Sequence, residues 1–267
     1  MAELSDWKVA ITLPIIDVRG RWSLAALERV MTKAVRSCVL ECRQVNGDAI
    51  CTTLSGGLDS SFCLAKIRQL VGPEVPIHTF TVGGSVHYPD VQFARIVSRC
   101  FNTIHHELIP SSAEIRKAEE KLRGRWKDEA SRPGSAAVFL AYQNIAQHNF
   151  KCVIAHDGID ELLGGYWEHR KYDDDEQKKA EAFRDFWDRL EEEHLLPLER
   201  KAQSLGVKVV LPYLQKSVVE YIARIPLRER TSFSESKIPL RVIAKKYLPR
   251  EIVTRKKKGF CSALDKT

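Results

Sequence analysis

The sequence predicts an α/β protein with a doubly wound parallel sheet and a helical C-terminal extension. Short β-favouring runs alternate with segments whose apolar residues recur at helical spacing, and a Gly-rich turn joins one run to the next helix. From Tyr172 the sequence predicts a long polar helix to about Leu205, and then a largely helical tail broken by prolines. Because parallel strands need crossover helices, this alternation favours a parallel sheet, whose ligands bind at the carboxyl ends of the strands.

The expected elements form four strand–helix units after a lead-in helix at residues 22–45. Strands are expected at residues 49–54, 77–82, 104–108 and 152–156, and helices at 62–70, 89–100, 111–125 and 135–148. We expect three regions: a lead-in at residues 1–45, an α/β core at 46–166, and a helical extension at 167–267 that closes one side of the site.

Composition and charge narrow the class of protein. The chain has 267 residues, a formal charge of +7 and seven cysteines. The charge suits an anionic ligand such as a nucleotide and leaves nucleic acid open. An odd number of cysteines, several in apolar runs, is typical of reduced thiols in a cytosolic protein, so we expect a cytoplasmic location. No secretion signal is visible and no stretch stays apolar for the ~20 residues that a bilayer requires, so no membrane partner is expected.

The turn Ser55–Ser61, Ser-Gly-Gly-Leu-Asp-Ser-Ser, is the strongest functional signal. Gly56 and Gly57 let the backbone turn tightly after a strand, and the next helix directs free N–H groups and its positive dipole end at the same place. Such a place binds phosphate. Flanking hydroxyls add donors: Ser55, Ser60 and Ser61. The Asp59 carboxylate would repel phosphate unless Mg²⁺ lay between them, so the motif implies a metal.

A second acidic cluster directly follows the strand expected at residues 152–156. Its three carboxylates lie within five residues: Asp157, Asp160 and Glu161. Carboxylates this close together at the end of a strand favour a bound cation, because they repel one another without one. The structural alternative is a helix N-terminus, where acidic side chains are also favoured.

Both segments resemble the N-type ATP pyrophosphatases. Ser-Gly-Gly-x-Asp-Ser-Ser after a strand resembles their pyrophosphate loop (PP-loop), which lacks the Gly-Lys-Ser/Thr ending of the Walker A loop. The segment Asp157–Tyr166 resembles the Gly-Glu-Gly-x-Asp-Glu-x-x-Gly-Gly-Tyr stretch of asparagine synthetases and β-lactam synthetases. The resemblance implies an adenine nucleotide alpha hydrolase-like, Rossmann-like core at residues 46–166 that cleaves ATP between its α and β phosphates.

The same resemblance implies roles for single residues. Asp59 and Asp160 would hold Mg²⁺ against ATP. Asp157 occupies the position at which the family has a carboxylate thought to help deprotonate or orient the incoming nucleophile. Four residues stand where those proteins line the adenosine pocket: Leu54, Val82, Ala155 and His156. A core histidine is the structural alternative for the last of them.

A cationic run near the C-terminus resembles a third element of the family. Alone, Arg255–Phe260 (Arg-Lys-Lys-Lys-Gly-Phe) is typical of a surface patch or a nucleic-acid signal. Together with the other two motifs, it resembles the family's closing loop Arg-x-Lys-x-Gly-Phe. The lysine of that loop stabilises charge on the ATP phosphates, and Lys257 stands at its position. Upstream, Lys237 with Leu240-Arg241 matches the family's Lys-x-x-Leu-Arg helix.

The sequence also departs from that family. Asp157 stands where asparagine synthetases have Glu, and its side chain is one methylene shorter, which would draw a positioned base back from its proton. Residues 210–215 read Val-Leu-Pro-Tyr-Leu-Gln where the family has Arg-Val-Pro-Phe-Leu-Asp, so Gln215 replaces a charge. Residues 131–135 match the family only loosely, so the pocket for the substrate carboxylate is not assigned.

The activity implied is that of an AMP-forming ligase. ATP and a carboxylate, aspartate by default, would give an acyl-adenylate and pyrophosphate, and ammonia or another amine would then form the amide. Glutamine-hydrolysing relatives begin with a Cys-nucleophile domain, whereas this chain has Ala2 and only 54 residues before its loop. We therefore expect the nucleophile to come from free ammonia, another amine or a separate glutaminase subunit. A homodimer is compatible with the sequence.

Two other functions remain open at this point. A tRNA-modifying PP-loop ATPase would share the loop and use the positive charge, but such enzymes often have paired catalytic cysteines or an RNA-binding domain, and neither is found, so a nucleic-acid partner is not favoured. A nucleotide-binding partner subunit with impaired catalysis would account for the changes at Asp157 and Gln215.

Overall fold

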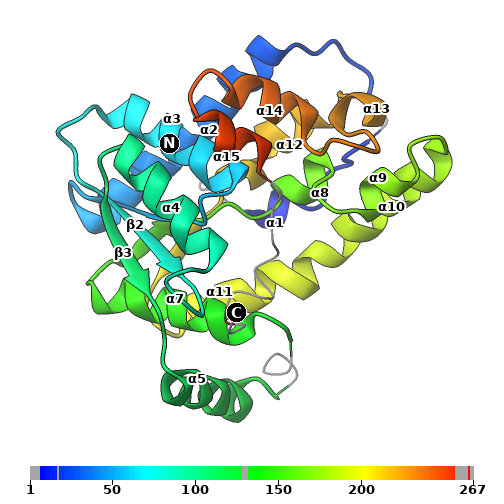
Figure 1. The fold of residues 1–267 in the computed structure, drawn as a ribbon. Helices are drawn as coiled ribbons and strands as arrows, with labels where there is room; N and C mark the ends of the chain where they lie inside the picture. The colour runs from blue at the N-terminus through cyan, green and yellow to red at the C-terminus, as the bar shows by residue number, and fades with distance from the viewer. Residues whose placement is uncertain (1–6, 17, 128–131, 256–263, 265–267) are drawn as a thin grey trace.

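The computed structural model describes residues 7–16, 18–127, 132–255 and 264. Within them, five parallel strands form one sheet between two layers of helices, as Figure 1 shows. The strands are β1 (Ile50–Thr53), β2 (Ile77–Val82), β3 (Ile104–Leu108), β4 (Cys152–Ile154) and β5 (Lys208–Val210). The predicted doubly wound α/β class is therefore confirmed.

The order of the strands locates the ligand-binding edge. The sheet reads β3-β2-β1-β4-β5, so the chain moves outward from β1 to β3 and then returns to the other side of β1. Between β1 and β4 the direction of winding reverses, and Thr52 pairs with Ile154 there. In open parallel sheets, the crevice outside the carboxyl ends of the strands at such a reversal is the usual ligand site. The segments after β1 and β4 are the two acidic, Gly-rich motifs.

Helices cover both faces of the sheet. One face carries α2 (Leu24–Asn46), α3 (Leu58–Val71) and α4 (Pro89–Cys100), and the other carries α5 (Ser112–Arg125), α7 (Ser135–Gln147) and α11 (Leu196–Gln203). The remaining helices are α1 (Trp7–Ala10), α8 (Ile159–Leu163), α9 (Glu168–Lys171), α10 (Glu176–Leu190), the π-helical η1 (Glu191–Leu195), the 3₁₀ turn η2 (Pro212–Leu214), α12 (Lys216–Ile222), α13 (Leu227–Arg230), α14 (Ile238–Ala244) and α15 (Arg250–Thr254).

Local sequence signals set several of these boundaries. Helix α2 begins after Ser23, whose hydroxyl accepts a bond from the amide of Ala26, and it ends at Gly47 with a φ of 75°. Helix α5 begins with a capping box in which Ser111 and Glu114 bond to each other's backbone amides. Helix α4 has Pro89 in its first turn, where the absent N–H costs no hydrogen bond.

Most expected elements form within a few residues of the predicted limits. Strands β2 and β3 and helix α4 have the predicted bounds. The prediction was incomplete in the extension, where the segment expected to be largely helical also contributes β5 to the sheet. The long polar helix expected from residue 172 to 205 is divided into α10, η1 and α11. The three-region division remains a prediction, with the addition that residues 208–210 complete the sheet of the core.

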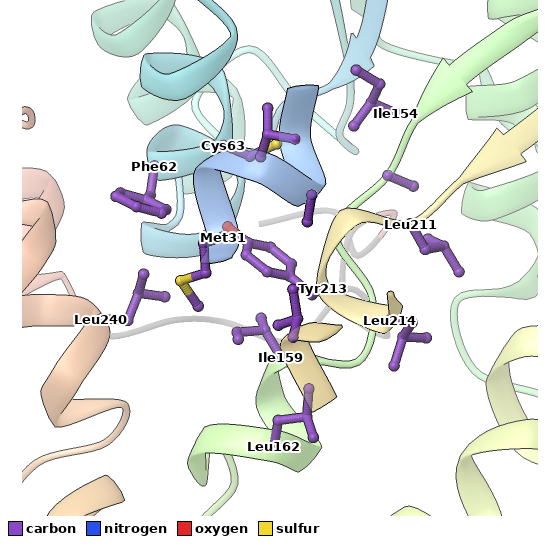
Figure 2. Close-up of a cluster of buried hydrophobic side chains, with 14 of the residues drawn as sticks. Met31, Phe62, Cys63, Ile154, Ile159, Leu162, Leu211, Tyr213, Leu214 and Leu240 are labelled. Carbon is purple, nitrogen blue, oxygen red and sulfur yellow. The ribbon is translucent and has the colours of Figure 1, made fainter. Parts of the chain in front are cut away.

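The main hydrophobic core lies behind the strand ends that carry the two motifs. Figure 2 shows Tyr213 of η2 amid side chains from five other elements, namely Met31, Phe62, Cys63, Ile154, Ile159, Leu162 and Leu240. Its hydroxyl donates to the carbonyl of Asp59 at 2.8 Å. The extension thus packs against the same core as the sheet and supports the first turn of α3.

None of the helices in the described parts of the chain combines the length and the apolar character that crossing a bilayer would require.

Candidate functional site

The turn after β1 has the conformation that its two glycines allow. Gly56 has a φ of 63°, and a Cβ on it would lie 2.3 Å from the carbonyl carbon of Phe93, so only glycine fits against α4. Gly57 has a φ of −78° and caps α3 without a side chain. The amides of the first turn of α3 are therefore left for a ligand, as the phosphate-loop prediction requires.

Hydroxyl groups line this turn. Ser55 Oγ and Ser60 Oγ lie 3.2 Å apart, and the amide of Gly57 donates to Ser55 Oγ at 3.3 Å. Ser60 Oγ donates to the carbonyl of Gly57 at 3.3 Å. Ser61 is buried, and its hydroxyl has no hydrogen-bond partner among the described residues. The long bonds within the turn leave its hydroxyls able to reorient towards an incoming phosphate.

The second motif follows β4 and depends on two further glycines. Gly158 has a φ of 92°, and a Cβ there would lie 2.3 Å from Leu214 Cδ2. A Cβ on Gly165 would lie 1.7 Å from Asp160 Oδ1, so this glycine makes room for the carboxylate. Asp160 stands in the first turn of α8. The close approach of backbone and side chains here explains the Gly-rich pattern.

Lys237 joins the two motifs, although sequence analysis assigned it no role beyond a match to the family helix. Its Nζ lies 2.6 Å from Asp59 Oδ2 and 2.7 Å from Asp160 Oδ1. The lysine is buried, with 4% of its surface exposed, and it has a left-handed backbone conformation with φ 54° at the N-cap of α14. Its buried ammonium is therefore held between two carboxylates that are 101 residues apart in the chain.

The two carboxylates fit the predicted magnesium ligands in chemistry and placement. Asp59 and Asp160 each direct one oxygen at a single point, which the Lys237 ammonium occupies. Carboxylate oxygens on rigid elements are the donors that Mg²⁺ prefers when it also binds substrate phosphates. The ammonium of Lys237 therefore lies at the point where the sequence predicted Mg²⁺.

Arg255 brings the C-terminal region to the first turn. Its guanidinium donates to the carbonyl of Ser55 at 2.9 Å, pairs with Asp90 of α4, and lies 4.4 Å from the ring centre of Phe93. This arginine begins the predicted closing loop. Lys257 itself lies outside the described residues, so its predicted place on the ATP phosphates stays a prediction.

A cavity of about 260 Å³ opens at the carboxyl ends of β1, β2 and β4. Eight of the predicted site residues line it: Leu54, Ser55, Asp59, Ser60, Val82, Ala155, His156 and Asp157. Gly56 and Gly57 form the turn beside it, and Ser61 lies buried in α3. Its far wall comes from α7, η1 and α11, with Arg132, Ser135, Tyr142, Glu193, His194 and Lys201. The sequence assigned none of these to the site, because residues 131–135 match the family only loosely and because only the folded chain brings η1 and α11 to the strand ends.

Gln215, one of the departures from the family, faces α2. Its side-chain amide donates to the carbonyl of Ala34 at 3.2 Å and to Cys38 Sγ at 3.5 Å. This amide supports the packing of η2 on α2, so the change from Asp to Gln at this position concerns the core.

A buried histidine lies next to the second motif. His169 of α9 is 0% exposed and stacks on Phe183 of α10 at 4.2 Å between ring centres. Neither ring nitrogen has a hydrogen-bond partner among the described residues. Burial lowers the pKa of His169 to about 3, although the carboxylate of Asp160 opposes that shift. The imidazole is therefore neutral in the native state at ordinary pH.

This histidine should make the protein sensitive to acid. An unfolded histidine titrates near 6.5, so below that pH the unfolded state binds more protons, and stability is lost as pH falls from about 6.5 towards 3. In His169→Phe, which keeps the aromatic contact, we expect the loss between pH 6.5 and pH 4 to shrink by roughly 3 kcal/mol. Urea unfolding at pH 7.5, 6, 5 and 4 measures it. Parallel stability curves for the two proteins would contradict the assignment.

Comparison of the sequence with known proteins identifies a family. A sequence model of the asparagine synthase family matches residues 26–205 and 173–267. The chain is 29% identical over 251 residues to a probable glutamine-hydrolysing asparagine synthetase of Acanthamoeba polyphaga mimivirus, covering 90% of this chain and 43% of that protein. It is 27% identical over 230 residues to the glutamine-hydrolysing asparagine synthetase B of Escherichia coli K12, covering 78% of this chain and 40% of that protein.

The chain thus spans less than half the length of these relatives. The family match, by contrast, extends over nearly all of this chain and contains the turn after β1, the motif after β4 and Lys237. The chain therefore belongs to the asparagine synthase family.

Proposed function

We propose that the chain is an ATP-dependent, AMP-forming ligase that adenylates a carboxylate, by default aspartate, and joins ammonia or another amine to it. The observation that carries this proposal is the convergence of Asp59, Asp160 and Lys237 beside the glycine turn, where Asp59 also lines the cavity. Acid groups for a cation and amides for phosphate meet at the strand ends, where ATP would be bent and cleaved. The names of the relatives add support.

The phosphates of ATP would lie against the turn. The proposed contacts are the amides after Gly56 and Gly57 and the hydroxyls of Ser55, Ser60 and Ser61. Leu54, Val82, Ala155 and His156 would line the nucleoside, since they border the same cavity. Arg255 holds the backbone of Ser55 in place, and Lys257 would bring a further charge to the phosphates.

Asp59 and Asp160 would hold Mg²⁺, which supplies charge neutralisation for the departing pyrophosphate. Because Lys237 occupies the point between these carboxylates, its ammonium would move towards the phosphates when the metal binds. The lysine would then serve as a second positive charge at the same reaction centre.

The test is release of pyrophosphate from ATP and Mg²⁺ across a panel of amino acids and other carboxylates, with ammonium as the amine. Release that depends on one acid, accompanied by its amide and AMP, would support the ligase. Lack of release with every acid, together with tight ATP binding, would instead favour a nucleotide-binding partner subunit. Release that depends on tRNA would favour the RNA-modifying alternative.

The source of the amine needs its own comparison. Ammonium, glutamine, and glutamine with an added glutaminase are supplied in turn to the same adenylating mixture. Amide formation with ammonium alone would identify free ammonia as sufficient, whereas a requirement for the added enzyme would support a glutaminase partner.

A further inference from the structure

His156 differs from the family motif in a way that the structure makes specific. The motif has glycine where this chain has His156, immediately before the position at which Asp157 replaces glutamate. Both side chains line the cavity. His156 and Asp157 are neighbours in the chain, so this chain places an imidazole directly beside the shortened carboxylate.

The ring of His156 is held between two threonines of β1. Its Nε2 lies 3.3 Å from Thr52 Oγ1, and its Nδ1 lies 3.3 Å from Thr53 Oγ1. Thr52 is fully buried, whereas Thr53 is half-buried and lines the cavity. The imidazole therefore connects a hydroxyl in the interior to a hydroxyl at the cavity wall.

The hydrogen bonds of Thr52 determine the tautomer. Its hydroxyl donates to the carbonyl of Ile154 at 2.9 Å, and a hydroxyl has only one proton. Towards His156, Thr52 Oγ1 must therefore accept, which assigns the ring proton to Nε2. Nδ1 is then the ring nitrogen that carries no proton, and it can accept a hydrogen bond from the hydroxyl of Thr53. The Thr53 hydroxyl, the His156 imidazole as its base and the Thr52 hydroxyl that orients the imidazole thus lie in a row. This arrangement activates hydroxyls in many enzymes.

We propose that Thr53 and His156 form the proton relay for the amine in the second step of the reaction, an inference that rests on the proposed ligase function. The amine nitrogen forms a bond to the acyl carbon, and the C–O bond to AMP breaks as the tetrahedral intermediate collapses. The amine proton passes to Thr53 Oγ1 while the proton of that hydroxyl passes to His156 Nδ1. The imidazolium then releases its proton to water.

An imidazole suits this step better than the shortened acid. General bases work best when their pKa lies near the operating pH, and an ordinary histidine titrates near 6.5 whereas an ordinary aspartate titrates near 3.9. Other titratable groups line the same cavity, among them Asp157 of the same loop, Asp59 of α3 and Tyr142 of α7, and the ring centre of Tyr213 lies 6.5 Å from that of His156.

The experiment separates the two half-reactions. Exchange of pyrophosphate into ATP, dependent on the acid identified above, reports adenylation, which transfers no amine proton. In Thr53→Val we expect exchange within about threefold of the parent protein and amide formation from ammonium at least ~100-fold slower. In His156→Gln, whose side chain also borders the proposed nucleoside pocket, we expect the rate of amide formation to fall at least ~100-fold further than the rate of exchange.

A matched pair elsewhere provides the control. His105 Nδ1 lies 2.8 Å from Thr79 Oγ1 on neighbouring strands and is not among the cavity-lining residues, so His105→Gln should leave both half-reactions unchanged. Thr53→Ser keeps the hydroxyl and should retain activity. Equal amide formation in the parent and in His156→Gln, with exchange intact, would overturn the relay and leave the ligase standing. Absence of exchange in the parent protein would overturn the ligase, and with it the relay.

A spectroscopic readout requires no substrate. The ¹⁵N shifts of the His156 ring in the nucleotide-free protein should report a proton on Nε2 and a bare Nδ1, and Thr53→Val should shift the Nδ1 signal. A proton on Nδ1 would overturn the relay whatever the activity of the protein.

Discussion

Lys237→Met is expected to lower the free energy of unfolding by about 3–5 kcal/mol without Mg²⁺, because it removes the buried positive charge that two carboxylates share. Asp59 and Asp160 both lie within 2.7 Å of the ammonium that this change deletes. Methionine keeps the length and apolar body of the stem, so the loss reports charge more than packing. The measurement is urea unfolding at low ionic strength.

The same variant should gain more from Mg²⁺ than the parent protein does. With the ammonium gone, the two carboxylates repel each other and a divalent cation can take its place, so millimolar Mg²⁺ should recover much of the lost stability. In the parent protein the ion must compete with Lys237, and its effect on stability should be small.

A second buried lysine provides the comparison. Lys66 lies 2.7 Å from Glu28 and is also buried, but it contacts Glu28 of α2 and the ring of Tyr247 and is not among the cavity-lining residues. Lys66→Met should also destabilise the protein, and Mg²⁺ should not reverse that loss. If Mg²⁺ affects the two variants equally, the carboxylates at Asp59 and Asp160 are not a metal site.

The elements of the sheet were predictable because they repeat a strong local signal. Strands such as Ile77–Val82 are apolar runs bounded by turns, and helices such as Pro89–Cys100 have a capping proline and a regular apolar stripe. Strand β5 has only three residues, Lys208–Val210, and exists because it pairs with β4. A strand that short has no period of its own, so its place is fixed by tertiary contacts that the sequence does not reveal.

The candidate site divides in the same way. The turn at Gly56 and the acidic cluster at Asp160 could be recognised, since glycine and carboxylate patterns indicate their chemistry locally. Lys237 could be singled out by its match to the family helix, but its role could not be predicted, because that role depends on a left-handed backbone at the start of α14 and on the packing of that helix against α3 and α8. The pairing of His156 with Thr52 and Thr53 likewise exists only once β1 and β4 lie side by side.

Gly56→Ala is expected to abolish nucleotide binding and to destabilise the fold. Its φ of 63° is strained for alanine by about 1–2 kcal/mol, and the new methyl group would meet the backbone of Phe93 at 2.3 Å, which adds about 1–3 kcal/mol of overpacking. Because a backbone cannot yield as a side chain tip can, the turn would have to move away from α4. The amides of α3 would then no longer face the cavity, and we expect ATP affinity to fall at least ~100-fold.

Two other glycines separate the causes of that loss. Gly206 has a φ of 72° and nothing within 4 Å of the place that an added methyl group would take, so Gly206→Ala should cost about 1–2 kcal/mol from strain alone and leave ATP binding intact. At Gly57 the φ is −78° and the nearest contact is Ser55 Oγ at 3.2 Å, so Gly57→Ala should fold nearly normally. Calorimetric titration with Mg²⁺ and ATP, alongside urea unfolding, measures all three. If Gly56→Ala bound ATP as tightly as Gly206→Ala, phosphate would have to bind elsewhere, because the close contact between this turn and α4 is what holds the amides of α3 in place.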